Sequence, residues 1–322
     1  MHPRPEIIVL TPVYEDGPSF GVLAKEISNA LSGKVYLIAV DDGSLRLAPA
    51  ISDLLAANLP GEIIRLRRNV GHQRAIALGL NYIADSYPEA TVVIMDSDGE
   101  DQPKTITSLL NSLSYTEIDI AVAKRKKRVV SFQFRFFYQI YKALFLVLTG
   151  KKINFGNFMA LKPFAVQRMA VMQELWVHVA GAVLVSKLRI DVKPIERGPR
   201  FIGESKMNFV SLVLLGFKAF IVFSDDILVR VGITCAFLAL LSLVLMPIPI
   251  YLKSIGMASP GWSSILFGVF LLVFIQACTV ALLTLLLSGL SKSSGMQPVE
   301  YRSLILEIEK NESTSTNYLN LD

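Results

Sequence analysis

Residues 35–44 read VYLIAVDDGS and residues 91–101 read TVVIMDSDGED. In each stretch, a short run of mostly β-branched apolar residues ends abruptly in acidic residues and glycine. Near-continuous apolar runs of this length are typical of strands in a parallel sheet that is covered on both faces. The two stretches therefore predict buried strands with acidic groups at their carboxyl ends.

Similar runs lie on either side of these stretches, and segments with helical spacing separate them. The further predicted strands are Ile7–Leu10, Ile63–Leu66 and Ile118–Ala123. The predicted helices are Ser19–Leu31, Gln73–Ala84 and Thr105–Leu113, the last opened by Pro103. This alternation predicts an α/β fold with an open, mostly parallel sheet and helices on both faces. Ligands of such sheets bind beyond the carboxyl ends of the strands, where both acidic clusters fall.

The second acidic cluster suggests a metal site. Asp96 and Asp98 are two residues apart after a predicted strand, so a turn can aim both carboxylates at one point. Mg2+ and Mn2+ prefer carboxylate oxygens and commonly bridge phosphate groups. An Asp-x-Asp turn alone is more often a solvated loop. The acidic pair Asp41-Asp42 on the same expected edge strengthens the metal hypothesis.

The composition is strongly apolar, with 52% hydrophobic and 18% charged residues, whereas an ordinary soluble domain is nearer a quarter charged. This excludes a disordered, collagen-like or disulfide-scaffold protein. The apolar excess lies after Asp226, where Val231–Leu252 and Ile265–Leu290 contain no charged residue. About 20 apolar residues span a bilayer as a helix. We therefore predict two transmembrane helices, at about 229–252 and 265–290; the alternative is a pair of buried helices in a large globular core.

The charge pattern suggests an orientation. Ile7–Leu10 is too short for a signal-peptide core, and the segment 253–264 between the spans holds a single Lys, which favours a cytoplasmic catalytic part. The net charge is only +5, and the basic run Lys124–Arg128 adjoins an aromatic stretch. An anionic membrane surface explains that run more simply than nucleic acid does. Cys235 and Cys278 lie in the predicted spans and are interpreted as packing residues.

The predicted organisation has four parts. Residues 1–206 form a cytosolic catalytic domain, with an interfacial helix at about 132–148. Residues 207–226 form a juxtamembrane amphipathic helix, and 227–290 contain the two spans. Residues 291–322 form a polar cytosolic tail that we expect to be disordered. A third span at Met207–Phe223 is the alternative for the juxtamembrane segment, and it would break the even topology.

Five motifs occur in a characteristic order. They are Thr11–Asp16 (TPVYED), Val40–Ser44 (VDDGS), Arg68–His72 (RNVGH), Asp96–Asp98 (DSD) and Arg200–Lys206 (RFIGESK). Followed by two spans, they resemble the membrane-anchored family 2 glycosyltransferases with the GT-A fold, in the polyprenyl-phosphate group that includes dolichol-phosphate mannose synthases. The resemblance covers about residues 6–292. It implies an inverting, Mg2+- or Mn2+-dependent transfer of a hexose, glucose by family frequency, from a UDP-sugar to undecaprenyl or another polyprenyl phosphate. It also implies a multi-pass protein of the bacterial inner membrane, and it is compatible with a homo-oligomer.

The resemblance implies a role for each matching residue. Contacts to the nucleotide sugar are implied for Pro12, Tyr14, Glu15, Asp16, Asp41, Asp42, Asp96, Arg125 and Ser205. Metal ligation is implied for Asp96, Asp98 and Glu100. Contacts to the acceptor phosphate are implied for Arg125, Arg135 and Lys206, and a catalytic role for Asp98, Arg200 and Lys206. The plainer alternatives are packing for Tyr14, a loop or cap role for His72, and surface charges for the basic residues.

Three positions depart from the family pattern. Glu15-Asp16 stands where Asn-Glu is usual, Glu100 stands where Gln is usual, and Asn157 stands where the family often has an Asp considered as a base. Asn157 cannot accept a proton. A lipid monophosphate needs no base, because its second pKa is near 6 and it is mostly dianionic at pH 7. The departure therefore favours a phosphate acceptor.

The sequence leaves several alternatives for the sugar, the acceptor and the activity open. Mannose, N-acetylhexosamine or aminoarabinose could replace glucose on the same lipid. A processive polysaccharide synthase usually has a Gln-x-x-Arg-Trp motif, and neither Trp176 nor Trp262 has that context. Transfer to the hydroxyl of a diacylglycerol-type lipid would require a base. A non-catalytic membrane scaffold would not require the Asp96/Asp98 pair.

Overall fold

The computed structural model describes residues 5–31, 35–125, 132–203, 209–257, 261–294 and 300–311. The chain divides into two compact units. A globular unit contains Met1–Ser131, Ile153–Val222 and Pro298–Asp322, and a helical unit contains Phe132–Lys152 and Phe223–Gln297. The chain thus leaves the globular unit twice and returns to it twice.

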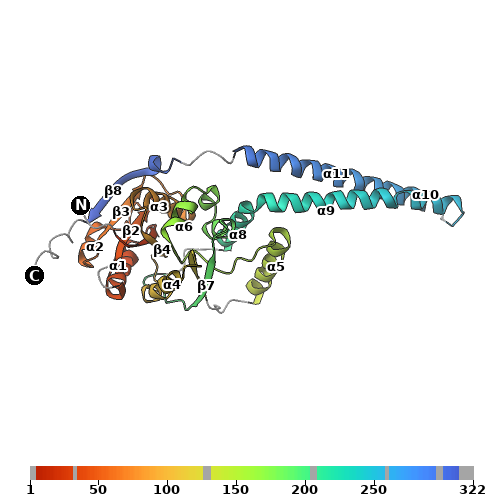
Figure 1. Ribbon diagram of the computed structural model, residues 1–322. Helices are drawn as coiled ribbons and strands as arrows, with labels where there is room; N and C mark the ends of the chain where they lie inside the picture. Colours follow the sequence, from red (N-terminus) through yellow and green to blue (C-terminus); the bar gives the residue numbers. More distant parts are fainter. Residues whose placement is uncertain are drawn as a thin grey trace, which may run out of the picture. The chain divides into compact units, whose positions relative to one another are not determined.

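The globular unit is built on a mixed, mostly parallel sheet. Its strands, in spatial order, are β7 (Ile190–Ile195), β5 (Ile120–Arg125), β6 (Met159–Leu161), β4 (Thr91–Ile94), β1 (Ile7–Val13), β2 (Val35–Asp41), β3 (Gly61–Leu66) and β8 (Ile305–Asn311) (Figure 1). β6 and β8 run antiparallel to their neighbours, and the other pairings are parallel. The predicted α/β fold with a mostly parallel sheet is confirmed.

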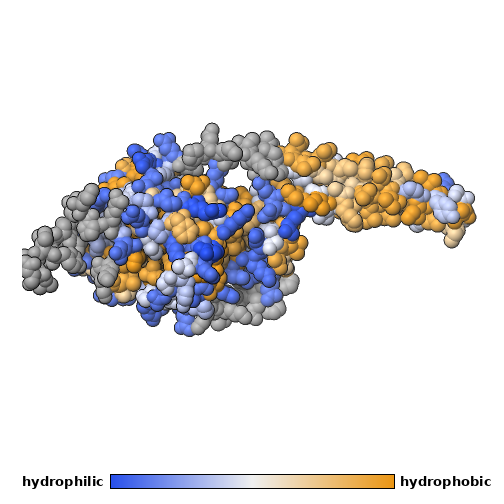
Figure 2. Space-filling model, in the orientation of Figure 1, coloured by the Kyte–Doolittle hydropathy of each residue, from blue (hydrophilic) through white to orange (hydrophobic). Residues whose placement is uncertain are grey.

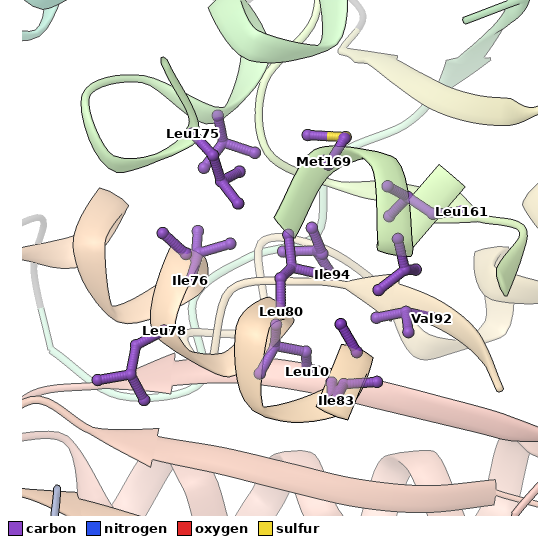
Figure 3. Close-up of a cluster of buried hydrophobic side chains, with 14 of the residues drawn as sticks. Leu10, Ile76, Leu78, Leu80, Ile83, Val92, Ile94, Leu161, Met169 and Leu175 are labelled. Atoms are coloured by element: carbon purple, nitrogen blue, oxygen red, sulfur yellow. The ribbon is translucent and has the colours of Figure 1, made fainter. Parts of the chain in front are cut away.

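Helices cover both faces of this sheet, because successive residues of a strand point to opposite faces. Val9 of β1 packs in one buried cluster with α1 (Gly17–Leu31), α2 (Ile51–Ala56) and α4 (Ile106–Leu113). Leu10 packs in the other cluster with α3 (His72–Ser86), α6 (Pro163–Ala170) and α7 (Val179–Val185). Figure 3 shows this second cluster, where Leu10 and Ile94 meet Leu80 and Ile83 of α3 and Met169 of α6. The sheet is therefore a rigid base for the loops at its carboxyl edge.

The polar tail is partly ordered. We expected it to be disordered, and this is wrong for the short helix η3 (Tyr301–Leu304) and for β8. Within β8, apolar and charged residues alternate only over Leu306–Glu309, which is too short a stretch to predict a strand from the sequence. Its partner β3 is distant in sequence, which is why local composition suggested disorder. Residues 312–322 lie outside the described part of the chain.

The helical unit contains α5 (Phe132–Thr149), α9 (Ser224–Leu245), α10 (Pro247–Ser254) and α11 (Trp262–Ser294). Ser224–Ser254 and Trp262–Leu287 are long and apolar enough to cross a membrane, which agrees with two candidate membrane-spanning helices. Figure 2 shows hydrophobic surface along most of these helices. α9 ends before Pro247, as proline requires. The helix predicted at 132–148 is α5, and it belongs to this unit and not to the catalytic domain in which we expected it.

α8 (Phe209–Val222) belongs to the globular unit and packs on α7, where a Cβ on Gly181 would lie 3.1 Å from Val222. Ala219 is buried, whereas Val213, Leu214, Phe217 and Ile221 are exposed. With 14 residues, α8 is about 21 Å long, less than the roughly 30 Å of a bilayer core. α8 is therefore shorter than a helix that spans a bilayer, and it carries exposed apolar side chains.

Candidate active site

The loop after β4 carries three of the predicted site residues, Asp96, Asp98 and Glu100. A tight turn forms it, in which the Glu100 N–H donates to Asp98 Oδ1 at 2.9 Å. Gly99 has φ +86°, and a Cβ there would lie 2.7 Å from the Phe201 ring. Only glycine fits both the positive φ and the close approach of Phe201.

The segment 197–201, which follows β7, packs on this loop. The Gly198 N–H donates to the Glu100 carbonyl oxygen and the Phe201 N–H donates to the Asp98 carbonyl oxygen, both at 2.9 Å. This places two arginines beside the carboxylates. Arg200 Nη2 lies 2.6 Å from Asp98 Oδ2, and Arg197 forms an ion pair with Glu100. The structure therefore brings Arg200 and Asp98 together across about a hundred residues of sequence.

Sequence reasoning missed Arg197. Its side chain is 27% exposed, and burial lowers the pKa of its guanidinium while the charges of Asp98 and Asp96 oppose this shift. The available signal was the spacing Arg197-Gly-Pro-Arg200, which places a second cation just before the recognised motif. The RFIGESK motif begins at Arg200 and therefore does not include Arg197.

The composition of this cluster suits a divalent cation together with a diphosphate. Among the described residues, no three His, Cys, Asp or Glu side chains form a group that could hold a metal ion. The carboxylates of Asp98 and Glu100 instead face guanidinium cations. The Nε atoms of Arg197 and Arg200 are buried and have no hydrogen-bond partner, although Arg200 Nε lies 3.5 Å from Glu100 Oε1. A buried donor without a hydrogen bond is costly unless an acceptor arrives. Carboxylates suit Mg2+ or Mn2+ and guanidinium N–H groups suit phosphate oxygens, so the residues present fit both.

A second group beside this loop joins three elements. His72 begins α3, and its Nε2 lies 3.4 Å from Asp96 Oδ1 and 3.0 Å from Asn157 Nδ2. Asn157 precedes β6, so its position depends on the antiparallel return of the chain. The position that departs from the family pattern therefore lies beside Asp96, with an amide where the family often has a carboxylate.

Asp42 holds the start of α3. Its Oδ1 accepts the Val70 N–H at 2.6 Å and its Oδ2 accepts the Gly71 N–H at 2.9 Å. The side chain is buried, which raises the pKa of this carboxyl, and the two backbone hydrogen bonds oppose the rise. Asp42 thereby fixes the RNVGH motif, a role that the predicted nucleotide contact did not include.

Asp41 and Glu15 tie together the loops after β1 and β2. Asp41 Oδ1 accepts the Ser44 N–H at 3.0 Å, and Ser44 Oγ accepts the Glu15 N–H at 2.8 Å. The Glu15 carboxylate accepts backbone N–H groups of Leu45, Arg46 and Leu47. These bonds, first of all that from Leu45, lower the pKa of Glu15. Glu15 thus connects the loops after β1 and β2 at the carboxyl edge of the sheet.

The other predicted residues have simpler surroundings. Pro12 is buried in β1, and Tyr14 after it is 47% exposed. Asp16 accepts a hydrogen bond from Ser19 Oγ at 2.8 Å at the start of α1. Arg125 ends β5 and Arg135 lies in α5. Ser205 and Lys206 lie outside the described residues, so their predicted contacts stay predictions.

The fold is that of known nucleotide-sugar enzymes. Glucosyl-3-phosphoglycerate synthase from Mycobacterium tuberculosis, solved with Mn2+, UDP and glucosyl-3-phosphoglycerate, has a TM-score of 0.52 at 15% identity. The match covers 70% of this chain and 80% of that one. The same enzyme solved with Mg2+ and UDP has a TM-score of 0.51. At this identity the likeness shows the fold alone, which is the GT-A class.

The family follows from the sequence match. The profile of glycosyl transferase family 2 matches residues 8–176, just over half of the chain. The chain belongs to this family.

Two curated proteins are similar. Dodecaprenyl-phosphate galacturonate synthase of Rhizobium johnstonii is 30% identical over 128 residues, which is 38% of this chain and 37% of that protein. An uncharacterised glycosyltransferase of Synechocystis sp. is 25% identical over 294 residues, covering 86% of this chain and 88% of that one. The chain thus spans well under half of the first relative's length.

Proposed function

We propose that this protein transfers a hexose, glucose in the first instance, from a UDP-sugar to polyprenyl phosphate at the cytoplasmic face of a membrane. The observation that carries the proposal is the acidic loop after β4 facing Arg197 and Arg200 at the carboxyl edge of the sheet. The name of the Rhizobium relative supports a prenyl-phosphate acceptor, and the Mycobacterium structures support UDP with a divalent cation.

In the donor half of the site, carboxylates would bind the cation and guanidinium groups would bind the diphosphate. Asp96, Asp98 and Glu100 would hold Mg2+ or Mn2+, which as a Lewis acid stabilises the departing diphosphate. The carboxylates of Asp98 and Glu100 are released for this when the guanidinium groups of Arg200 and Arg197 turn to the phosphate oxygens. The buried Nε donors of Arg197 and Arg200 gain acceptors in the same movement. Binding of the donor therefore exchanges one set of charge pairs for another.

The acceptor half requires positioning more than proton transfer. Asn157 lies next to His72 and Asp96 and carries no charge. A dianionic lipid phosphate attacks the anomeric carbon without a base, provided that it is held in line with the departing UDP. Attack from the opposite side inverts the configuration at that carbon. A neutral residue at 157 also avoids electrostatic repulsion of a second anion in the site.

The membrane half of the proposal rests on two apolar surfaces. The exposed face of α8 carries Val213, Leu214, Phe217 and Ile221, and this surface suits the interface of a bilayer. The two candidate spans lie between Val222 and Pro298, which both belong to the globular unit. A chain that leaves and returns to one water-exposed unit must cross the membrane an even number of times. We therefore propose a multi-pass protein of the bacterial inner membrane with its catalytic unit in the cytoplasm.

The test uses the purified full chain, undecaprenyl phosphate, Mn2+ and labelled UDP-glucose. Labelled lipid is the expected product, and Asp98→Asn should reduce its rate at least a hundredfold because the proposed cation loses a ligand. Glu117→Gln, which neutralises an exposed carboxylate elsewhere, is the matched control and should leave the rate unchanged. Absence of labelled lipid with every nucleotide sugar tried, or an unaffected Asp98→Asn variant, would overturn the proposal.

A uronic acid is the second candidate sugar, since the Rhizobium relative is named for galacturonate. A parallel assay with UDP-galacturonate distinguishes the two candidates. Mass spectrometry of the lipid product then identifies the sugar directly. A preference for UDP-galacturonate would replace glucose in the proposal and leave the acceptor chemistry unchanged.

A further inference from the structure

β8 connects the end of the chain to the catalytic sheet. It follows the helical unit in sequence, yet it pairs with β3 in an antiparallel register from Gly61↔Asn311 to Leu66↔Ile305 (Figure 1). Asn311 Nδ2 donates to the Leu59 carbonyl oxygen at 3.0 Å, and Tyr301 Oη donates to Asp85 Oδ2 at 2.5 Å. Both ends of the segment are thereby attached to the globular unit.

One anchor of β8 is a buried carboxylate near the amino end of β3. Glu62 has no exposed surface, and Lys310 of β8 donates to its Oε1 at 2.9 Å. Tyr36, Tyr82 and Tyr87 also donate to this carboxylate. Burial raises the pKa of Glu62, but these donors outweigh it and hold the pKa below its ordinary value. This anchor attaches the strand at a distance from the carboxyl edge.

A second contact runs from β8 towards the carboxyl edge through Arg65 of β3. Arg65 Nε forms an ion pair with Glu309 and lies 3.4 Å from Glu307 Oε1. Arg65 Nη1 lies 3.0 Å from Asp41 Oδ2, and Nη2 donates to the Pro49 carbonyl oxygen at 3.1 Å. Each guanidinium nitrogen therefore has an oxygen partner, and the planar group is held in one orientation.

Asp41 connects the contacts from β8 to the contacts of the loop after β2. Its side chain is only 3% exposed, so a change in the orientation of Arg65 cannot be absorbed by solvent. The other oxygen of Asp41 accepts the Ser44 N–H, and Ser44 holds the backbone of Glu15 in the loop after β1. The carboxylates of β8 are thus two side chains away from the loops that line the predicted nucleotide site.

We propose that Glu309, with Glu307 beside it, is a positioning residue for nucleotide binding. Glu309 holds the guanidinium group of Arg65 in place. Arg65 in turn sets the orientation of the Asp41 carboxylate and the extent to which its negative charge is neutralised. Without the charge of Glu309, the guanidinium shifts towards Asp41, pairs more closely with it and draws it from the nucleotide. The inference rests on the proposed function in one respect, because it takes Asp41 as a contact of the nucleotide.

The experiment compares Glu309→Gln with Lys310→Gln in the full chain. Both changes neutralise a charge on β8, but only Glu309 contacts Arg65. We expect Glu309→Gln to weaken Mn2+-dependent UDP binding, measured by calorimetry, roughly tenfold, as the loss of about one well-formed charged contact would. The KM for the nucleotide sugar should rise by a similar factor with kcat nearly unchanged. Lys310→Gln should lower the thermal midpoint and leave UDP affinity unchanged.

Two further measurements separate the possible outcomes. In the Arg65→Gln background, Glu309→Gln should cause no additional loss of UDP affinity, because the two residues act in series. Hydrogen exchange of the segment around Ser44 should become faster in Glu309→Gln and not in Lys310→Gln, whether or not UDP binds. Unchanged UDP affinity and exchange in Glu309→Gln, or equal losses in both variants, would overturn the inference. If the wild-type protein does not bind UDP but Glu309→Gln still speeds hydrogen exchange around Ser44, the proposed nucleotide is wrong. The coupling between Glu309 and the loop after β2 would then still hold.

Discussion

At the scale of single residues, acidic side chains in similar sequence contexts have different binding partners. Asp42 accepts two backbone N–H groups at the start of α3, whereas Asp98 faces the guanidinium of Arg200. The difference arises because a turn that opens a helix exposes unpaired N–H groups, whereas the loop after β4 meets a basic segment. The motif alone predicted ligand contacts for both residues, since neither neighbouring group is adjacent in sequence.

Asn157→Asp tests the acceptor chemistry. A carboxylate at this position would lie beside Asp96 and repel a dianionic acceptor, so kcat/KM for the lipid phosphate should fall about tenfold or more. Steady-state kinetics with undecaprenyl phosphate measure this effect. Asn157→Gln, which keeps the amide, controls for the change of contact with His72. Higher activity in Asn157→Asp, above all with a hydroxyl acceptor, would contradict a phosphate acceptor.

At the scale of elements, the buried parallel strands were predictable and the short or edge strands were not. β1 and β2 are buried over nearly their whole length, so their apolar runs identify them. β6 has only three residues, Met159–Leu161, and β7 contains Lys193 and Pro194. Three residues cannot show a period of two, and proline weakens a strand signal. Their positions depend on pairing with β5, which is remote in sequence.

The N-terminal cap of α7 gives a pH dependence of stability. His178 Nδ1 accepts the Gly181 N–H at 2.9 Å. Burial, together with the charge of Lys218, lowers the pKa of His178 to about 4. The unfolded chain, with a pKa of about 6.5, binds the proton more readily, so stability is complete above pH 6.5 and falls towards pH 4. The loss is on the order of 3 kcal/mol in the free energy of unfolding.

Denaturant unfolding between pH 7 and pH 4 measures this dependence. His178→Asn keeps a capping acceptor without a titrating ring, so its stability should vary less over the same range. An equally steep decline in His178→Asn would assign the effect to other groups.

At the scale of the whole molecule, the decisive feature is that the chain returns to the sheet after the candidate spans. β8 belongs to the same sheet as β1, and Val222 and Pro298 belong to the same unit. A hairpin of two spans satisfies this connection, whereas one or three spans would separate β8 from β3 by a bilayer. The tail is therefore part of the catalytic unit.

Thiol labelling tests this topology. In a chain with Cys235 and Cys278 replaced by Ala, Met257→Cys, which follows α10, should react with a membrane-impermeant maleimide added outside intact cells. Tyr115→Cys and Glu300→Cys should react only after permeabilisation, because both exposed residues lie in the globular unit. Labelling of Glu300→Cys from outside would contradict the hairpin.

The sequence by itself determined the α/β class, the positions of the five buried parallel strands along the chain and the two apolar helices, because each depends on a local pattern of apolar residues. It also predicted Asp98 and Arg200 as site residues, and the structure places these two side chains in contact. Only the tertiary structure decided which carboxylates meet arginines, which meet backbone N–H groups, and that Arg197, Arg65 and β8 contribute. These contacts join segments up to 252 residues apart, since Asn311 of β8 donates to the Leu59 carbonyl oxygen. Local periodicity carries no information about such pairings, because they form only when the sheet assembles.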